Sequence, residues 1–381
     1  MQYTEQSELV DTINKHRQYP HISIDEHAKS KSVELSASID GVTKVYLDKR
    51  FWILLRDAHL GRSKQSSSEY LLCALRESVK RGAVICPISE SIFLELLKQQ
   101  DLYTRRATAE LIDELSLGLT VVPFDQRVAQ EIVGFMTKST CEPKMNHETK
   151  ELVWSKLSYV LGVVHPTSTP FTADVELALQ KAFFDHMWDV PLVEMLEHLE
   201  ECDILKGHSF QNIADNINDL NRQHSDEVKN FKKVYTNEFR GGLSLFMSIP
   251  RLWIESEYQK STGRSHVATE AEKLEHERKL HTFFGNLITE KRVALSLPTL
   301  HINSLCHAAV RWDKGRKLSK NDFYDFHHAA AAVGYCDAFM TEKPLMALLK
   351  QRHLELENDF PCKVMANVNE AVQWMEEIIV G

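Results

Sequence analysis

Residues 321–342 constrain the fold more than any other part of the chain. They begin with two acids three positions apart, Asp322 and Asp325, and an alanine-rich stretch follows. We expect a closely packed helix here, with both acids on one face about one turn apart. The apolar residues 338–340 then predict a short buried strand, and Glu342 lies where it ends. In α/β proteins, acids at strand ends and in first helical turns collect in one crevice.

The first third of the chain alternates between strand and helix patterns. Buried-strand patterns occur at 44–48, 83–86 and 119–123, and a helix-forming stretch follows each of the first two. Ser89 is a suitable N-cap for the helix predicted over 90–97. This alternation is typical of a parallel α/β sheet.

The middle of the chain has a different character. Residues 126–294 are richly charged, with helical periodicity and few strand patterns, and short strand–helix units return over 295–381. We therefore expect an α/β fold of three layers (α/β/α) with a central parallel sheet, made from 41–125 and 295–381 and interrupted by a large all-α insertion. Residues 1–40 are predicted to be an N-terminal helical extension.

Composition limits the class of protein. The 381 residues and their 43% hydrophobic content are those of an ordinary globular protein with two domains or one interrupted domain. Seven scattered cysteines without a CxxC pair argue against a zinc ribbon or a disulfide framework, so we expect reduced thiols and a cytoplasmic location. No signal peptide and no apolar run long enough to span a bilayer is evident, so we expect no membrane partner. The net charge of −9 does not mark a nucleic-acid binder, although local patches matter more than the total.

Four carboxylates occupy comparable places in the two α/β blocks. Asp48 ends the first strand, Glu95 lies in the helix after the second strand, Asp325 opens the C-terminal helix, and Glu342 follows the next strand. We expect these four acids to converge at the carboxyl edge of one sheet. Like charges repel there unless a cation holds them, and Mg²⁺ or Mn²⁺ prefers such oxygen ligands.

Each acid also has a simpler interpretation. Asp48 would serve only as a helix cap, Glu95 would lie on a solvated helix face with Glu90 as its rival, and Asp322 would be a first-turn acid favoured by the helix dipole rather than a further metal ligand. A divalent metal bound by such acids generates hydroxide near neutral pH and stabilises charge on a phosphoryl oxygen. That chemistry is phosphodiester hydrolysis.

These acidic segments resemble the successive motifs of the PIN-domain nucleases. The segments that carry the resemblance are 45–48, 88–96, 321–325 and 341–342. The resemblance implies a PIN-like fold in which Asp48, Glu95 and Asp325 are the core metal ligands and Glu342 stands where many members have Asp. Lys49 is a departure, because asparagine commonly follows the first acid in the family.

The central insertion is a second departure, because the toxin ribonucleases of the superfamily are compact. The chain is more similar to longer bacterial PIN-like proteins, which implies a toxin or anti-phage defence role.

A basic segment leads directly into the acidic helix. We expect it to bind a phosphate backbone and stack a base, and the alternative is a solvated loop. The residues assigned to substrate binding are Arg311, Trp312, Arg316, Lys317 and Lys320. Lys314 belongs to the same basic segment, and Arg105 and Arg106 are further candidates. For His327 and His328 we favour packing over contact with substrate or ligand.

No phosphate-binding loop, dinucleotide-binding turn, nucleophile elbow or HExxH helix occurs. We therefore predict a metal-dependent endonuclease acting on nucleic acid, with RNA slightly favoured over single-stranded DNA. One alternative is a catalytically silent PIN-like module whose insertion binds a partner protein. Another is a nuclease silenced by its insertion or by dimerisation.

Overall fold

The computed structural model describes residues 2–140, 148–199, 210–224, 229–264, 268–287 and 291–380. The chain forms two compact units. Unit 1 consists of Met1–Pro123, Lys150–Leu205 and Val372–Gly381, and unit 2 consists of Phe124–Thr149 and Lys206–Ala371. Residues 126–294, which we expected to form one insertion, contribute to both units.

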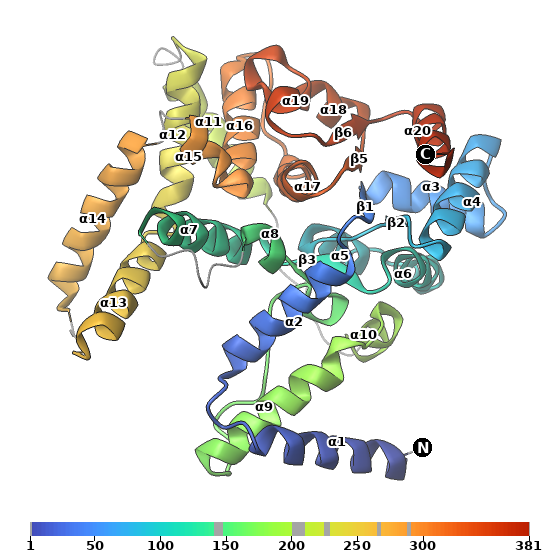
Figure 1. Cartoon of the computed structure of the whole chain (residues 1–381). Helices are drawn as coiled ribbons and strands as arrows, with labels where there is room; N and C mark the ends of the chain where they lie inside the picture. Colours follow the sequence, from blue (N-terminus) through green and yellow to red (C-terminus); the bar gives the residue numbers. More distant parts are fainter. Residues whose placement is uncertain are drawn as a thin grey trace. The chain divides into compact units, whose positions relative to one another are not determined.

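Unit 1 is a helical body that contains two short strand pairs (Figure 1). Its helices are α1 (Gln2–Arg17), α2 (Ile24–Ser38), α3 (Lys49–His59), α4 (Ser66–Lys80), α5 (Glu90–Leu97), α6 (Leu102–Ser116), α9 (Ala173–Trp188) and α10 (Leu192–Leu199), with the short η2 (Leu157–Tyr159). Its strands are β1 (Thr43–Leu47), β2 (Val84–Ile85), β3 (Leu119–Val121) and β4 (Trp154–Lys156).

Strands β1 and β2 are parallel, with Thr43 opposite Val84 and Lys44 opposite Ile85. The last three residues of β1 are fully buried, because helices α3 and α4 pack beside this pair. The strand and helix boundaries agree with the sequence prediction to within one or two residues. Local burial and capping patterns were therefore sufficient for this part of the fold.

Strand β3 pairs antiparallel with β4, with Val121 opposite Trp154. This pairing differs from our expectation in two ways. The strand pattern at 119–123 predicted another member of a parallel sheet, and β4 lies within 126–294, which we expected to be all-helical. A single parallel bridge, from Ile88 to Thr120, joins β3 to the segment after β2.

Unit 2 is also mostly helical (Figure 1). Its helices are α7 (Phe124–Thr140), α11 (Gln211–Gln223), α12 (Phe231–Ser244), α13 (Ser248–Thr262), α14 (Glu270–Leu287), α15 (Lys291–Leu295), α16 (Pro298–Trp312), α17 (Asp322–Tyr335), α18 (Lys343–Leu349) and α19 (Leu356–Asp359), with the short η4 (Arg352–Leu354). Its strands are β5 (Ala338–Met340) and β6 (Lys363–Met365), while α8 (Thr149–Leu152) and α20 (Val368–Val380) each contribute residues to both units.

The core of unit 2 lies between α7, α12 and α16. Its centre consists of large apolar side chains, among them Ile132, Phe239, Leu243 and Leu300. Helix α12 approaches α16 closely at Gly242, where an added Cβ would lie 2.8 Å from the Leu300 Cδ1 atom. Close packing of α16 fixes the position of α17, which packs directly against it.

Strands β5 and β6 are parallel, and their register pairs Ala338 with Lys363 and Met340 with Met365. The Thr341 N–H continues the ladder by donating to the Met365 carbonyl at 2.8 Å. The chain is thus mostly helical with short parallel strands, which agrees with the expected α/β class. Within the described ranges, no helix is both long and apolar enough to cross a membrane.

Candidate functional site

In unit 1, the carboxylate of Asp48 lies at the carboxyl end of β1. Its side chain caps α3, since Oδ1 accepts a hydrogen bond from the Phe51 N–H at 3.2 Å, and the residue is only 6% exposed. The capping role that sequence offered as the simpler interpretation is therefore real. Because a carboxylate offers about four acceptor sites, this single capping bond does not by itself exclude a metal-binding role for Asp48.

The turn before α5 is joined to the same end of β1. The Tyr46 hydroxyl and the Ser89 Oγ lie 2.6 Å apart, and both residues are fully buried. Ser89 is the N-cap residue of α5, as expected, although its side chain makes no capping bond. Because β1 and β2 are parallel, the starts of α3 and α5 lie at one edge of the pair.

Glu95 lies on α5 and forms an ion pair with Lys49, with 3.4 Å between Lys49 Nζ and Glu95 Oε1. Lys49 follows Asp48 directly, so this contact places Glu95 in the neighbourhood of the first strand end. The Lys49 ammonium also partly neutralises Glu95, and a metal at this carboxylate would have to compete with it.

Glu90, the rival of Glu95, is more deeply placed than the sequence suggested. It lies in the first turn of α5 and is 7% exposed, between the buried residues Ser89 and Ser91. A buried acid at a helix N-terminus is stabilised by the helix dipole. Both glutamates of α5 thus remain candidates for the same role.

In unit 2, Asp325 and Glu342 lie at the same end of the packed pair formed by α17 and β5. Only two residues separate the end of α17 at Tyr335 from the start of β5, so helix and strand run in opposite directions where they pack. Asp325 lies about ten residues before Tyr335, or ~15 Å along the helix. Glu342 lies about five residues beyond Asp337, or ~16 Å along an extended chain. The two carboxylates therefore belong to the same end of the α17–β5 pair.

The two acids differ in exposure. Asp325 is half-buried, whereas Glu342 is exposed and is the N-cap residue of α18 without a side-chain capping bond. Nothing in the fold of unit 2 requires the Glu342 carboxylate as a cap. A ligand or water-positioning role is therefore compatible with its place after β5.

Asp322, by contrast, has a structural role. One of its carboxylate oxygens accepts from the Ser319 N–H at 2.6 Å, the other accepts from Arg316 Nη2 at 2.7 Å, and the residue is 6% exposed. The Ser319 Oγ in turn accepts from the Asp322 N–H at 3.3 Å. This reciprocal pair has the bonding pattern of a capping box, although Asn321 is the N-cap residue of α17. The serine three residues before the acid was a sequence signal that we did not use. Asp322 is therefore the poorest metal ligand among the candidates.

The basic segment before α17 is a fixed loop rather than a loose one. Asn218 holds Leu318 at both backbone groups, since its amide donates to the Leu318 carbonyl and its carbonyl accepts from the Leu318 N–H, each at 2.8 Å. Arg316 is occupied by Asp322, and Arg311 forms an ion pair with Glu238 at 2.8 Å.

The remaining members of this loop face solvent. Trp312 is 37% exposed, with its ring edge-on to Phe231. The lysines of the loop are all exposed: Lys314, Lys317 and Lys320. Of the expected substrate-binding groups, the lysines and the tryptophan are thus accessible, while the two arginines hold the loop in shape.

His327 has the packing role that we favoured. Its ring stacks on Phe124 at 4.4 Å, and burial, together with the neighbouring Arg127, lowers the pKa of His327 to about 3. His328 is 2% exposed. His327 therefore packs against Phe124 as a neutral ring, and His328 lies buried in α17 rather than facing a substrate.

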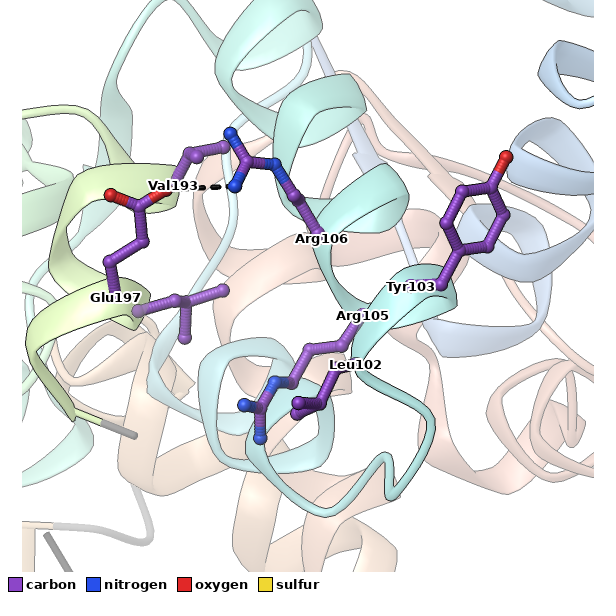
Figure 2. A pocket seen from close by; sticks show the side chains of 7 residues that line it. Leu102, Tyr103, Arg105, Arg106, Val193 and Glu197 are labelled. Atoms are coloured by element: carbon purple, nitrogen blue, oxygen red, sulfur yellow. Dashed lines mark hydrogen bonds and ion pairs between the residues drawn. The ribbon is translucent and has the colours of Figure 1, made fainter. Parts of the chain in front are cut away.

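Arg105 and Arg106, the further basic candidates, line an open pocket of about 280 Å³ between α6 and α10 (Figure 2). Arg106 forms ion pairs with Glu110 at 3.1 Å and Glu197 at 2.9 Å, and Figure 2 shows the latter across the pocket. These acids offset the positive charge of Arg106, one of the two arginines that line the pocket.

The chain was compared with known proteins. No family model matches it, and no match was found among curated proteins or among solved structures.

Proposed function

We propose that the chain is a metal-dependent endonuclease of PIN-like type, acting on RNA in preference to single-stranded DNA. The proposal depends mainly on Asp325 and Glu342, which lie at the same end of the packed α17–β5 pair. Unit 1 supports it with the buried Asp48 at the end of its own parallel strand pair.

The donor set fits a hard divalent cation. The acids that would hold Mg²⁺ or Mn²⁺ are Asp48 with Glu95 or Glu90 in unit 1, and Asp325 with Glu342 in unit 2. All are carboxylates, which are the ligands such ions prefer. When bound, the metal supplies activation of water and neutralisation of charge on the phosphate. Asp322 does not fit this set, because its carboxylate already holds the loop before α17.

The chain's own residues bind and orient the substrate. The exposed lysines of the fixed loop attract the phosphate backbone next to α17, and Trp312 offers a ring face to a base. Because Asn218 and Asp322 fix this loop, binding would cost little ordering entropy. Glu342 is the exposed carboxylate available to accept a proton from the attacking water.

One observation favours the alternative, a catalytically silent PIN-like module. Lys49 occupies the position after the first acid and neutralises Glu95, and Arg316 neutralises Asp322. Carboxylates that are already paired need no metal to offset their charge. In such a module the helical segments, rather than the acids, would bind a partner protein.

Cleavage assays distinguish the two functions. Labelled single-stranded RNA and DNA are incubated with Mn²⁺ or Mg²⁺ and wild-type protein, Asp48→Asn or Glu342→Gln, with Glu69→Gln and Glu357→Gln as exposed controls. The nuclease requires metal-dependent cleavage that both site variants lose and both controls keep. Cleavage of neither substrate by the wild type would favour the binding module.

The same cleavage assay determines which of the two glutamates of α5 holds the metal. Glu90→Gln and Glu95→Gln are compared, and the glutamate that holds the metal is the one whose loss abolishes cleavage. Lys49→Ala should lower the Mn²⁺ concentration required if Glu95 is that residue, because the competing cation is removed.

A further inference from the structure

Three helices of unit 1 bring together two histidines and an aspartate, none of which is among the acids discussed above. His16 lies on α1, His27 on α2 and Asp185 on α9, and α1 and α2 both pack against α9 (Figure 1). His16 Nε2 is 2.9 Å from one carboxylate oxygen of Asp185, and His27 Nε2 is 2.8 Å from the other. All three ligand atoms lie within 4.8 Å of one another.

The cluster lies on an apolar floor and is partly shielded from solvent. The side chains of His16, His27 and Asp185 are 10%, 16% and 25% exposed. The His27 ring meets Phe184 edge-on at 5.7 Å, and Phe184 is itself stacked on Tyr159. Asp185 is the most exposed of the three side chains.

The backbone around the cluster is held in place. Lys181, one turn before Asp185 on α9, is 1% exposed and donates to the carbonyls of Tyr19 and Ile22 at 2.8 and 3.1 Å. These carbonyls belong to the connection between α1 and α2. The histidines of both helices are therefore presented to Asp185 by a fixed turn, which is the condition for a site formed before its ligand arrives.

The donor set is that of a zinc site. Zn²⁺ takes imidazole nitrogen and carboxylate oxygen at ~2.0–2.2 Å, and three protein ligands leave a fourth position for water. Mixed nitrogen and oxygen ligands favour Zn²⁺ over Mg²⁺, so this cluster is chemically distinct from the all-carboxylate set.

We propose that His16, His27 and Asp185 form a three-ligand Zn²⁺ site that fastens α1 and α2 to α9. The site does not depend on the proposed nuclease activity, because it shares no residue with the carboxylates of that activity. Its contribution is to the attachment of the N-terminal helices.

The competing explanation is a hydrogen-bonded latch in which both imidazoles donate to Asp185. Lys31 separates the two explanations, because its Nζ lies 3.6 Å from the Asp185 oxygen that faces His27. In a latch, Lys31 adds to the attraction that holds the helices. In a zinc site, it repels the incoming dication, so removing it should tighten zinc binding about tenfold.

The test is a Zn²⁺ titration of the full-length chain, freed of metal beforehand, with thermal unfolding recorded at each zinc concentration. The proteins are the wild type, His27→Ala, Lys31→Ala and, as a control for adventitious binding, His276→Ala at an exposed position of unit 2. Co²⁺ replaces Zn²⁺ in a parallel titration, since its absorption spectrum separates nitrogen and oxygen ligation from thiolate ligation.

The proposal predicts one zinc per chain in the wild type and in His276→Ala, and affinity at least about tenfold lower in His27→Ala. It also predicts tighter binding in Lys31→Ala and a cobalt spectrum without thiolate bands. Absence of zinc binding in the wild type, equal affinity in His27→Ala, or weaker binding in the folded Lys31→Ala variant would each overturn it.

Discussion

Glu131, in the interior of unit 2, gives a prediction whose size follows from the structure. The residue lies on α7 and is completely buried, and its Oε1 accepts hydrogen bonds from the Thr299 N–H at 2.9 Å and from the Tyr335 hydroxyl. These bonds tie α7 to the starting turn of α16 and to the end of α17. Burial raises the pKa of Glu131 from 4.5 to about 7, against the opposing effects of its two donors and of Arg127.

The free energy of unfolding depends on pH because Glu131 loses its proton at a lower pH in the unfolded chain than in the folded one. Between pH 4.5 and 7 the carboxyl is already ionised in the unfolded chain and still protonated in the folded one. The folded state therefore binds more protons, and the free energy of unfolding falls as pH rises through this window. At ~1.4 kcal/mol for each pKa unit, the loss amounts to about 3 kcal/mol. It is complete above pH 7.

Glu131→Gln removes this dependence while keeping an oxygen that can accept both bonds. Urea unfolding of the wild type and the variant at pH 4.5 and pH 7.5 gives four free energies, and the other titrating groups cancel in the difference between the two proteins. We expect the wild type to lose about 3 kcal/mol more than the variant over this interval. Equal losses in the two proteins would refute the argument that burial dominates at Glu131.

Two further predictions concern packing and substrate binding in unit 2. Gly242→Ala should lower the free energy of unfolding by about 1–3 kcal/mol, because its Cβ meets Leu300. Gly241→Ala has open space around it and should raise the free energy of unfolding by about 0.5–1 kcal/mol. If urea unfolding shifts alike in both variants, the close approach of α12 and α16 is contradicted. Replacing three exposed lysines with alanine should weaken binding of single-stranded RNA and reduce the salt dependence of log K by about 2, at ~0.7 for each phosphate contact. Fluorescence anisotropy over a salt series measures this, and an unchanged slope would show that the loop does not contact the backbone. These lysines are Lys314, Lys317 and Lys320.

The elements of the fold that sequence predicted well are those with local signals. Helix α5 begins and ends where expected, at Glu90 and Leu97, and β1 and β5 agree to within a residue. Each has a short apolar run bounded by a cap or by an acid, so its boundaries are encoded in neighbouring residues. The positions of Asp48, Asp325 and Glu342 at strand ends and in a first helical turn follow from the same patterns.

Pairings between distant segments could not be predicted in this way. The three residues of β4 are too few to show a strand period, and their antiparallel pairing with β3 joins positions more than 30 residues apart. The assignment of residues 150–205 to unit 1 likewise depends on contacts that no local pattern records. Such long-range pairing is decided by tertiary packing rather than by propensity.

The candidate sites show the same limit. The capping box of Ser319 and Asp322 was visible in the sequence, but the ion pair from Arg316 that completes it was not. His16 and His27 reach Asp185 across 169 and 158 positions, without any motif spacing. The sequence therefore predicted acids at strand ends, but not which of them form ion pairs or capping bonds in the fold.

The most direct test of the proposed function is single-turnover cleavage of one labelled single-stranded RNA over a series of Mn²⁺ concentrations. The wild type is compared with Asp325→Asn, which removes one ligand charge from the first turn of α17. We predict cleavage that saturates with Mn²⁺ in the wild type and a rate at least about 100-fold lower in the variant. Cleavage that persists after chelation of the metal, or that proceeds equally fast in both proteins, would contradict the account.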